Sequence, residues 1–439
     1  MKAYSENGWL VDRLKDIAEI NAISLGVDTP DDFEFSYLEI SNVDYYGIVS
    51  KDAIERICFE DAPSRARRRV RAHDVLVSSV RPNLQAIAHI DNDIDGELIC
   101  STGFNVVTPN PVKIIDRFLY YYILSEGNRQ HFEAIAKGVG YPALDDKDFE
   151  ATDIPLPPIP EQKRIAAYLD ASCAVIDRSV EIKQKQLETL DALRKSIIQK
   201  AVTQGLNPDV EVRDSGALHF RQIPRHWKVD RLKDLTSKIG SGVTPRGGAA
   251  SYIVEGIPLI RSQNVHFDGV VFDDIAFIDE ATHAQMSNSQ LTKGDVLLNI
   301  TGASIGRCAV LPETVEIGNV NQHVCILRSW GKLRPQFLNY FLISDAGQSQ
   351  VFAGFTGSSR EGLNFRQIGQ FKVPLPDPQE QQAIVDRLDQ QVSEFRRLTN
   401  CITDQITTLT AYRKSLIHEC VTGKRRISGA DVAEVEAHV

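Results

Sequence analysis

An internal repeat constrains the fold of this chain more than any other feature of its sequence. The segment IPLPPIPEQKRIAAYLD at 154–170 matches VPLPDPQEQQAIVDRLD at 373–389, an offset of 219 residues. The same offset aligns RKSIIQKAVT at 194–203 with RKSLIHECVT at 413–422. Self-similarity at one fixed offset indicates that the chain contains two copies of one structural unit. Each copy is a more variable block followed by a closely matched segment.

The closely matched segments have the apolar periodicity of long helices. Each begins after a Pro-rich stretch, and Glu161 or Glu380 lies where a helix N-terminus favours negative charge. In the second segment the apolar residues recur with a period of 3.6 and are Ile384, Leu388, Val392, Phe395, Leu398, Ile402, Ile406, Leu409, Tyr412, Leu416 and Cys420. In the first segment they are Ile165, Leu169, Cys173, Ile176, Val180, Leu187, Leu190 and Ile197. A single long helix cannot bury such a stripe, so we expect the two helices to pack antiparallel against each other. The alternative is two unrelated helices that cap separate cores.

The blocks that precede the helices have the pattern of α+β domains. Runs rich in β-branched residues predict strands at 75–80, 97–107, 270–278, 295–300 and 323–329, and shorter helices are predicted at 116–137 and 335–353. The expected fold class is α+β, with two globular domains separated by two long helices that form an antiparallel coiled coil, and with a pseudo-two-fold internal repeat. The predicted boundaries are 1–153 and 211–372 for the globular domains, 154–210 and 373–425 for the helical segments, and 426–439 for a tail expected to be flexible.

Several protein classes are excluded by what the sequence lacks. It has no run of 18 apolar residues and no N-terminal stretch of signal-peptide length, so we expect neither a membrane helix nor export. Its seven cysteines form no CxxC pair, which is typical of reduced thiols in a cytoplasmic protein. The ten histidines form no HExxH motif, so we expect no metal site, and there is no GxxxxGK[ST] phosphate loop. The letters GxSxG occur at 302–306, but no helix-forming run follows Ser304, so a turn between strands is the preferred interpretation.

The distribution of charge points to one basic cluster in an acidic block. The whole chain carries 49 basic and 59 acidic residues, a formal net charge of −10, which by itself argues against nucleic-acid binding. Residues 1–153 hold 16 basic and 27 acidic residues, yet they include RARRRVR at 65–71. Arginine suits bidentate contacts with phosphate or guanine. The residues expected to face DNA here are Arg65, Arg67, Arg68, Arg69 and Arg71, with Arg81 and Asn83 after the next strand. The alternative is a solvated or subunit-facing surface.

Polar, turn-rich segments supply further candidates. Loops of Ser, Thr, Asn, Gln and Arg between rigid strands can hydrogen-bond base edges while Arg and backbone amides hold phosphates. The candidates are Tyr141 in the first block and Thr244, Arg246, Arg261, Gln263, Asn264, Thr301, Ser304, Arg307, Gln322, Ser359 and Arg360 in the second. The alternative is that these are ordinary solvated loops.

Taken together, these segments resemble the specificity subunit of type I restriction-modification enzymes. The resemblance rests on the two-copy plan, on the helix starts and helix ends quoted above, on WLVDRLKD at 9–16 and WKVDRLKD at 227–234, and on IGSGVTPRGG at 239–248; it covers about residues 5–425. It implies two target-recognition domains, each reading one half of a bipartite double-stranded DNA site. It also implies that the helices set the gap between the half-sites and dock two methyltransferase (M) subunits, which restriction (R) subunits join.

The resemblance further implies that the chain has no catalytic residues and binds no cofactor or metal, whereas S-adenosylmethionine, ATP and Mg²⁺ belong to partner subunits. The repeated Arg-Lys-Ser helix ends are expected to bind partners through Arg194, Lys195, Ser196, Arg413, Lys414 and Ser415. The loop GVGYP at 138–142 replaces GSSRE at 357–361, so the two domains should not read the same half-site. Two other classes remain open, namely a coiled-coil scaffold that binds protein instead of DNA and a self-contained hydrolase that uses the turn at 302–306.

Overall fold

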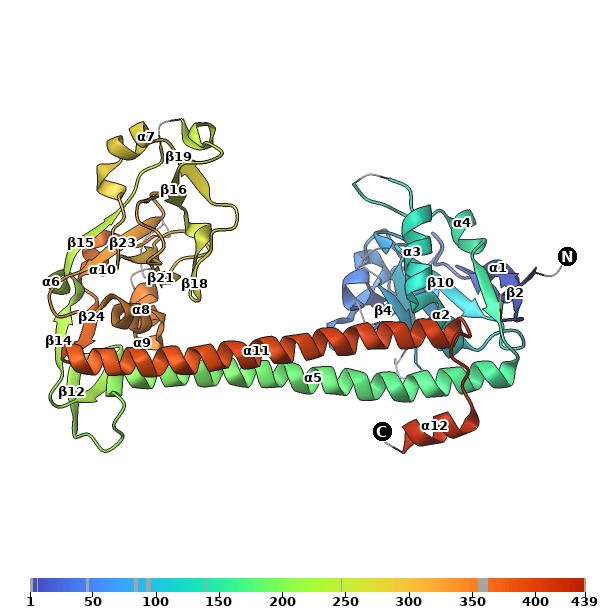
Figure 1. Ribbon diagram of the computed structural model, residues 1–439. Coiled ribbons are helices and arrows are strands. Elements are labelled where there is room, and N and C mark those ends of the chain that lie inside the picture. Colours follow the sequence, from blue (N-terminus) through green and yellow to red (C-terminus); the bar gives the residue numbers. More distant parts are fainter. Residues whose placement is uncertain are drawn as a thin grey trace. The chain divides into compact units, whose positions relative to one another are not determined.

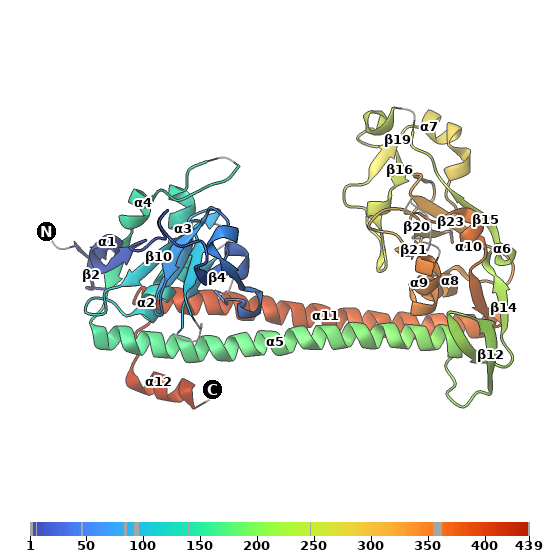
Figure 2. The ribbon, with the colours of Figure 1, turned by 180° about the vertical axis from the view of Figure 1, so that it is seen from behind.

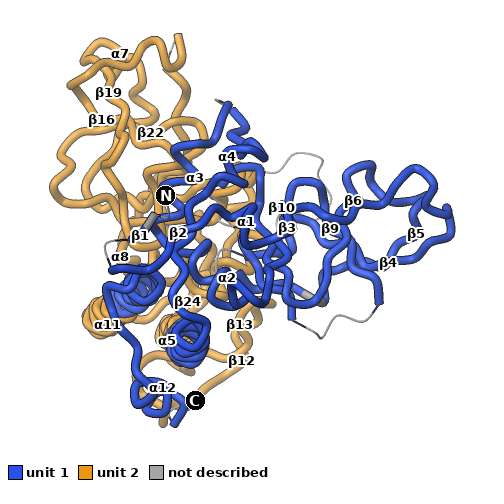
Figure 3. The backbone as a smooth tube through the Cα atoms, turned by 90° about the vertical axis from the view of Figure 1, so that its right-hand side faces the viewer, with its two compact units in different colours: residues 1–184, 403–439 blue, residues 185–402 orange. Residues whose placement is uncertain are grey.

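The chain divides into two units at points inside its two long helices. The computed structural model describes residues 3–5, 7–44, 47–82, 86–91, 96–138, 140–245, 247–353 and 362–437. Residues 1–184 together with 403–439 form unit 1, and residues 185–402 form unit 2 (Figure 3). Helix α5 spans Ile159–Gln204 and helix α11 spans Pro378–Val421, so each helix contributes to both units (Figure 1).

In the described residues of unit 1, the globular block contains three sheets and four short α-helices. The first sheet has the order β1-β2-β11, with bounds Ala3–Tyr4, Leu10–Arg13 and Asp153–Leu156. The second has the order β3-β10-β7-β8, with bounds Ala18–Ile20, Phe104–Pro109, Val75–Ser78 and Ile87–His89. The third has the order β5-β4-β9-β6, with bounds Glu55–Cys58, Glu34–Leu38, Leu98–Ser101 and Ala66–Val70. The helices are α1 Leu14–Ile17, α2 Asp116–Leu124, α3 Glu126–Ile135 and α4 Asp146–Glu150.

Unit 2 is built from strands and helices of the same kind. Its four-stranded sheet has the order β15-β23-β20-β21, with bounds Thr236–Ser241, Val324–Ser329, Val296–Asn299 and Cys308–Val310. Smaller sheets are β19-β16-β22 (Ala276–Ile278, Ile257–Ile260, Asn319–Val320), β14-β24 (Lys228–Arg231, Lys372–Leu375), β12-β13 (Val212–Ala217, Phe220–Pro224) and β17-β18 (Val265–His266, Gly269–Val270). The helices are α6 Leu232–Leu235, α7 Glu280–Gln285, α8 Pro335–Ile343, α9 Asp345–Ala353 and α10 Phe365–Gly369.

The strand order of the two units confirms the internal repeat. The antiparallel order β3-β10-β7-β8 of unit 1 recurs as β15-β23-β20-β21 in unit 2. Each unit also contains a parallel pair, β4 with β9 and β16 with β22. The registers correspond, because Leu38 faces Cys100 in the first pair and Ile260 faces Val320 in the second. Positions related by about 220 residues therefore occupy the same place in the two units.

One predicted strand of unit 1 and the predicted helices of both units, at 116–137 and 335–353, are interrupted. The stretch 97–107 forms β9 and β10, which are separate strands joined by a turn. The predicted helix at 116–137 is wrong as a single element, because Ser125 adopts an extended backbone between α2 and α3. The Ser125 hydroxyl donates to the carbonyl of Tyr122 at 2.7 Å, which offers the backbone an alternative to a continuing helix. Ser344 does the same between α8 and α9, where it donates to Phe341 at 2.6 Å.

The long helices pack antiparallel within unit 1. Arg164 of α5 donates to the carbonyl of Ile427 at 3.3 Å, and Asp177, further along α5, pairs at 2.9 Å with Arg413, which comes earlier in the chain. The apolar residues that the two helices contribute to the unit 1 core are Ile165, Leu169, Cys173, Ile176, Leu416, Ile417, Cys420 and Val421. Figure 2 shows the two helices side by side from the opposite direction to Figure 1.

The same helices share the core of unit 2. The residues that they contribute there are Ile198, Ala201, Val202, Ile384, Val385 and Leu388. The predicted mutual packing is therefore confirmed, and the alternative of two unrelated helices is wrong. The apolar stripe is not buried throughout, since Leu398 is 38% exposed and Tyr412 is 48% exposed.

Residues 426–439, expected to form a flexible tail, instead contain helix α12, Gly429–Glu436. The side chains and backbone amides of Ser428 and Asp431 form a capping box that satisfies the first turn of this helix. Ile427 is buried, and Arg426 pairs with Glu161 of α5 at 2.6 Å. The prediction of a flexible tail is therefore wrong, and the S-x-x-D spacing was the sequence signal for this helix.

No helix among the described residues is both long enough and apolar enough to span a membrane. All seven cysteines lie in the described part of the chain, none of them forms a disulfide, and Cys401 is exposed.

Candidate nucleic-acid interface

The arginine cluster of unit 1 is largely paired inside the protein. Strand β6 carries it and pairs antiparallel with β9, with an irregularity between Ala66 and Arg68. Arg65 donates to Glu39 at 2.6 Å and to the Tyr37 hydroxyl at 3.3 Å. Arg69 forms an ion pair with Glu97. The carboxylates that pair with this cluster therefore come from distant parts of the sequence.

Arg68 has a structural role. Its guanidinium donates to the backbone carbonyl of Phe104 and, at 3.0 Å, to the side-chain oxygen of Asn105 on β10. The side chain is half-buried, and burial lowers the pKa of its guanidinium. Arg68 therefore joins β6 to β10 through two acceptors inside unit 1, and its contact with DNA stays a prediction.

Arg67 and Arg71 have the least engaged guanidinium groups of the cluster, since the hydrogen bond from that of Arg67 goes to the carbonyl of Ala66 at 3.3 Å. Arg67 lies over the ring of Phe59 at 4.7 Å, and its backbone position on β6 leaves the side chain half-exposed. Arg71 is exposed, and it is its backbone amide that donates to Asp74 at 2.7 Å. Among the described residues, neither guanidinium forms an ion pair with a carboxylate. These two are the members of the cluster best suited to hold an external phosphate.

Arg81 and Tyr141 are predicted residues that the fold brings together. The Arg81 guanidinium lies 4.5 Å from the centroid of the Tyr141 ring, and Tyr141 is 74% exposed. The Arg81 amide donates to the carbonyl of Pro142 at 2.7 Å, and a β-bridge joins Val80 to Ala143. The loop after β7 and the segment around Tyr141 thus form one exposed edge. Asn83 lies outside the described residues.

In unit 2, four side chains form a continuous hydrogen-bonded network. Thr244 donates to the Gln322 oxygen at 2.5 Å, and the Gln322 amide nitrogen lies 2.9 Å from Nε2 of His323. Because that amide can only donate, His323 accepts at Nε2 and carries its proton on Nδ1, 2.6 Å from the Thr301 hydroxyl. Three of these residues were predicted to bind DNA. His323 was missed, although it stands directly after Gln322 in the sequence.

The network occupies the same place in unit 2 as the Arg81–Tyr141 pair occupies in unit 1. Thr301 follows strand β20 as Val80 follows strand β7, and a β-bridge joins Thr301 to Gly362 as one joins Val80 to Ala143. Arg246, Ser359 and Arg360, which were predicted to contribute here, lie outside the described residues.

A second group in unit 2 surrounds Asp274. Arg261 donates to the Asp274 carbonyl at 2.5 Å, and the Gln263 amide donates to the Asp274 carboxylate at 2.7 Å. Asn264 is buried, accepts from the Arg261 amide at 3.0 Å and donates to the Val271 carbonyl at 3.1 Å. The prediction that Asn264 contacts DNA is therefore wrong, because its side chain holds the local backbone. Arg261 and Gln263 remain partly exposed.

The turn at 302–306 joins antiparallel strands β20 and β21, as the preferred interpretation required. Gly302 and Gly306 both have positive φ, which glycine adopts without strain. The Ser304 hydroxyl accepts from the Asn299 side chain at 3.1 Å, and no histidine among the described residues hydrogen-bonds to it. A serine nucleophile needs an adjacent base, so this turn does not support the hydrolase interpretation. Arg307 follows the turn with a half-exposed side chain.

The Arg-Lys-Ser helix ends are only partly available for partners. Arg413 is buried and paired with Asp177, so its predicted interface role is wrong. Arg194 pairs at 3.0 Å with Asp268, which lies between β17 and β18. The exposed members form contacts along their own helices, where Lys195 binds Asp191 at 2.7 Å and Ser415 donates to Glu419 at 2.8 Å. Ser196 is exposed and Lys414 is half-buried.

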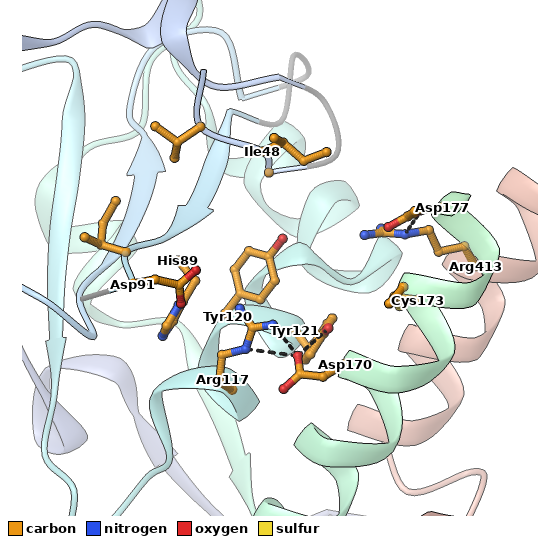
Figure 4. A pocket seen from close by; sticks show the side chains of 14 residues that line it. Ile48, His89, Asp91, Arg117, Tyr120, Tyr121, Asp170, Cys173, Asp177 and Arg413 are labelled. Carbon is orange, nitrogen blue, oxygen red and sulfur yellow. Dashed lines mark hydrogen bonds and ion pairs between the residues drawn. The ribbon is translucent and has the colours of Figure 1, made fainter. Parts of the chain in front are cut away.

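Each unit contains a pocket where its globular block meets the long helices. The unit 1 pocket has a volume of about 350 Å³ and is drawn in Figure 4; the unit 2 pocket has a volume of about 330 Å³. In unit 1, Arg117 and Tyr121 both donate to Asp170 of α5, the tyrosine at 2.7 Å. Burial raises the pKa of the Tyr121 hydroxyl well above its usual value, so it stays a donor.

The two pockets are related by the repeat. Tyr340 donates to Asp389 at 2.5 Å in unit 2, and both residues lie 219 positions after Tyr121 and Asp170. Arg413 lines the first pocket and Arg194 the second, again 219 positions apart. Sequence reasoning missed the two tyrosine–aspartate pairs, whereas it had predicted Arg194 and Arg413 as partner-binding residues. The sequence did contain a signal for the tyrosines, because the aligned segments FLYYYIL and FLNYFLI both have a tyrosine at this position, Tyr121 and Tyr340.

Known proteins match this chain in two separate stretches, one in each copy of the repeat. A family model described as the type I restriction modification DNA specificity domain matches residues 6–192 and 224–408. The chain is 27% identical over 320 residues to the type I restriction enzyme MjaVIII specificity subunit of Methanocaldococcus jannaschii, covering 72% of each protein. It is 21% identical over 428 residues to the MjaIX specificity subunit of the same organism, covering 95% of this chain and 94% of the relative.

Solved structures share the fold. A chain from a structural study of complex assembly and conformational transition of the type I R-M system superposes with a TM-score of 0.75 at 22% identity, covering 94% of this chain and 97% of that one. The crystal structure of the HsdS subunit from Thermoanaerobacter tengcongensis gives a TM-score of 0.51 at 23% identity, covering 96% of this chain and 98% of that one.

Proposed function

Because the chain belongs to the family of type I restriction-modification DNA specificity subunits, we propose that its two globular blocks read the two halves of a bipartite duplex target. One observation carries this proposal. Equivalent loops of the two units, after β7 and after β20, present different chemistry. Unit 1 offers a stacked arginine and tyrosine, and unit 2 offers a Thr-Gln-His-Thr network.

These two sets of side chains suit different base edges. An arginine guanidinium donates to acceptors such as the O6 and N7 atoms of guanine, or to phosphate. The amide of Gln322 and the hydroxyls of Thr244 and Thr301 both donate and accept, which suits adenine or mixed edges. The half-sites read by the two units should therefore differ in sequence.

We further propose that the chain recognises DNA without catalysing a reaction on it. The turn around Ser304 supports this, since Asn299 and not a base contacts its hydroxyl. Methyl transfer and cleavage would belong to M and R subunits, and S-adenosylmethionine, ATP and Mg²⁺ would bind to those subunits. A cytoplasmic location fits a protein whose target and partners are there.

The internal repeat also suggests how two M subunits bind to the chain. Equivalent surfaces at 219-residue spacing can bind two copies of the same protein in the same way. We assign the two M subunits to the exposed faces of α5 and α11 that flank the two pockets, and we propose that the length of the helices sets the gap between the half-sites.

A competition-binding experiment tests the function. The chain assembled with its M subunits should prefer duplexes that carry both half-sites over scrambled duplexes of the same length by about 10³-fold or more. Gln322→Ala should reduce that preference, and Ser237→Ala, an exposed position on β15, serves as the control. Equal binding to all duplexes, or assembly with partners without any DNA binding, would identify a scaffold instead.

A further inference from the structure

Two histidines and an aspartate of unit 1 converge although they are far apart in sequence. Nδ1 of His73 lies 2.7 Å from Oδ2 of Asp116, and Nε2 of His89 lies 2.8 Å from the same oxygen. The three ligand atoms all lie within 4.8 Å of one another. His73 comes from the turn between β6 and β7, His89 ends strand β8, and Asp116 begins helix α2.

The fold itself does not require this cluster, as unit 2 shows. Register places Val310 opposite Val296 where His89 faces Val75, so Val310 is the counterpart of His89. Helix α8 begins with Pro335 where α2 begins with Asp116. The counterpart of His73 is Gly294, and a Cβ atom at Gly294 would lie 3.3 Å from Pro335. Unit 2 thus builds the same corner with a glycine, a valine and a proline.

His73 has a backbone conformation that residues with a side chain adopt rarely. Its φ is +70°, close to the +81° of Gly294, and this conformation is unfavourable for a residue with a side chain. A glycine would fit the turn without strain, yet the chain places an imidazole there that is aimed at Asp116. Strain that is retained at such a position is typical of a functional site.

The surroundings of His89 match those of a metal ligand. Its side chain is 4% exposed, and Nδ1 lies 3.0 Å from a carboxylate oxygen of Asp91. A metal-bound histidine commonly donates its second ring N–H to a carboxylate, which fixes the ring and the tautomer. Asp91 occupies that outer position, while Nε2 of His89 points to Asp116. Figure 4 shows His89 and Asp91 together on the wall of the unit 1 pocket.

We propose that His73, His89 and Asp116 bind a divalent transition-metal ion of the zinc class. Two imidazole nitrogens and one carboxylate suit Zn²⁺, Co²⁺ or Ni²⁺, and water would complete the coordination. Ligand atoms around tetrahedral zinc are about 3.3 Å apart, so the present hydrogen-bonded separations would open by about 0.5 Å. The His73 side chain is 61% exposed and has room to make this shift. The ion would fasten the β6–β7 turn to strand β8 and helix α2.

The first test is metal binding by the full-length chain without an affinity tag, after removal of metal with a chelator. Titration calorimetry with Zn²⁺ should reveal one tight site per chain, and Zn²⁺ should raise the melting temperature. His73→Gly and His89→Val install the residues of unit 2, so both should fold and both should lose the tight site and the thermal shift. His131→Ala and Cys401→Ser, at exposed positions elsewhere, should behave as the unchanged protein does.

Two further readouts separate a metal site from a hydrogen-bonded cluster. Co²⁺ should give the visible absorption of a low-coordinate site, and His73→Gly should abolish it. Asp91→Asn should weaken Zn²⁺ binding by about 10- to 100-fold without abolishing it, as expected of an outer-shell partner. The proposal is overturned if the unchanged protein shows no tight site, or if His73→Gly and His89→Val bind Zn²⁺ as tightly as it does.

Discussion

The guanidinium of Arg81 stacks over the ring of Tyr141 at 4.5 Å, although the two residues lie 60 positions apart in the sequence. Arg81 has a φ of +49°, where its counterpart in unit 2, Gly302, has +73°. Both units therefore have a left-handed backbone conformation at this position, and in unit 1 the residue that adopts it carries a long charged side chain. A stacked arginine is held in one orientation, which favours selective contact with a base or a phosphate.

The arginine cluster should divide into DNA-binding and structural members. Arg67→Ala and Arg71→Ala should each lower the slope of log affinity against log salt by about 0.9 for every phosphate that the side chain neutralises, without a change in stability. Binding of the assembled complex to duplex DNA over a range of salt concentrations measures this. Arg68→Ala is the contrasting variant, since it should destabilise unit 1 by leaving the Phe104 carbonyl without its donor. A salt slope unaffected by Arg67→Ala and Arg71→Ala would place the cluster on a solvated surface.

The pairing of α5 with α11 should depend on the buried part of the apolar stripe. Leu416 is 1% exposed in the unit 1 core, and Leu416→Ala should cost about 2 to 5 kcal/mol of unfolding free energy through the cavity it leaves. Leu398 is 38% exposed on the same helix, so Leu398→Ala should cost less than about 1 kcal/mol. Urea denaturation followed by circular dichroism compares the two. Equal losses would mean that the stripe does not hold the helices together.

Asp74 and Asp295 occupy equivalent buried positions with different partners. Arg328 donates to Asp295 at 2.8 and 2.9 Å, whereas Asp74 accepts from the Thr108 hydroxyl at 2.6 Å. Asp295→Asn should cost about 1.5 to 3 kcal/mol, because it removes a charge-assisted pair. Asp74→Asn should cost less than about 1 kcal/mol, since an asparagine can satisfy the same neighbours. Urea denaturation at neutral pH measures both changes, and equal costs would contradict the difference in partners.

The same pair of variants should differ in pH dependence. Burial raises the pKa of Asp74 above its ordinary 3.8, so the folded state disfavours its ionised form. The contribution of Asp74 to stability is complete below pH 3.8 and declines as the pH rises through the raised folded value. Asparagine does not titrate, so Asp74→Asn should gain stability relative to the unchanged protein as the pH rises from 3.8 through the raised folded pKa. A relative stability that is constant, or that falls over this range, would refute the assignment.

Lengthening both helices should lengthen the target. Inserting one heptad after residue 184 of α5 and one after residue 402 of α11 keeps the apolar stripes in phase and adds about 10 Å to each helix. The gap between the half-sites should grow by about three base pairs, with the half-sites themselves unchanged. Sequencing of methylated sites in cells that express the variant measures the gap. Altered half-sites with the original gap would contradict a spacer role.

Local patterns in the sequence were sufficient to predict the repeat, the long helices and most of the central strands. Their periodicities are set by residues that are close in the chain, such as Val75 to Ser78 of β7. The Ser125 hydroxyl hydrogen-bonds to a backbone carbonyl and ends helix α2. The apolar periodicity of the sequence continues past Ser125, so it did not predict the break between α2 and α3. The spacing of Ser428 and Asp431 is that of a helix cap, and it indicated the start of α12 in a segment that was expected to be flexible.

The candidate site was less predictable, because whether each of its side chains is exposed or paired depends on residues that are distant in sequence. Nothing near RARRRVR shows that Glu39 and Glu97 will reach Arg65 and Arg69. Burial of Asn264 depends on the hairpin that supplies the Val271 carbonyl. The expectation of no metal site rested on short motifs, whereas His73, His89 and Asp116 meet only after folding.

Sequencing of methylated bases in cells that express this chain with its M subunits tests the central claim most directly. The unchanged protein should direct methylation to a bipartite target with two different half-sites. Arg81→Ala should relax recognition in one half-site, and Gln322→Ala should relax it in the other, each by about 1 to 3 kcal/mol for the base that is no longer read. A continuous or symmetric target, or loss of recognition in the same half-site by both variants, would contradict the assignment of one half-site to each unit.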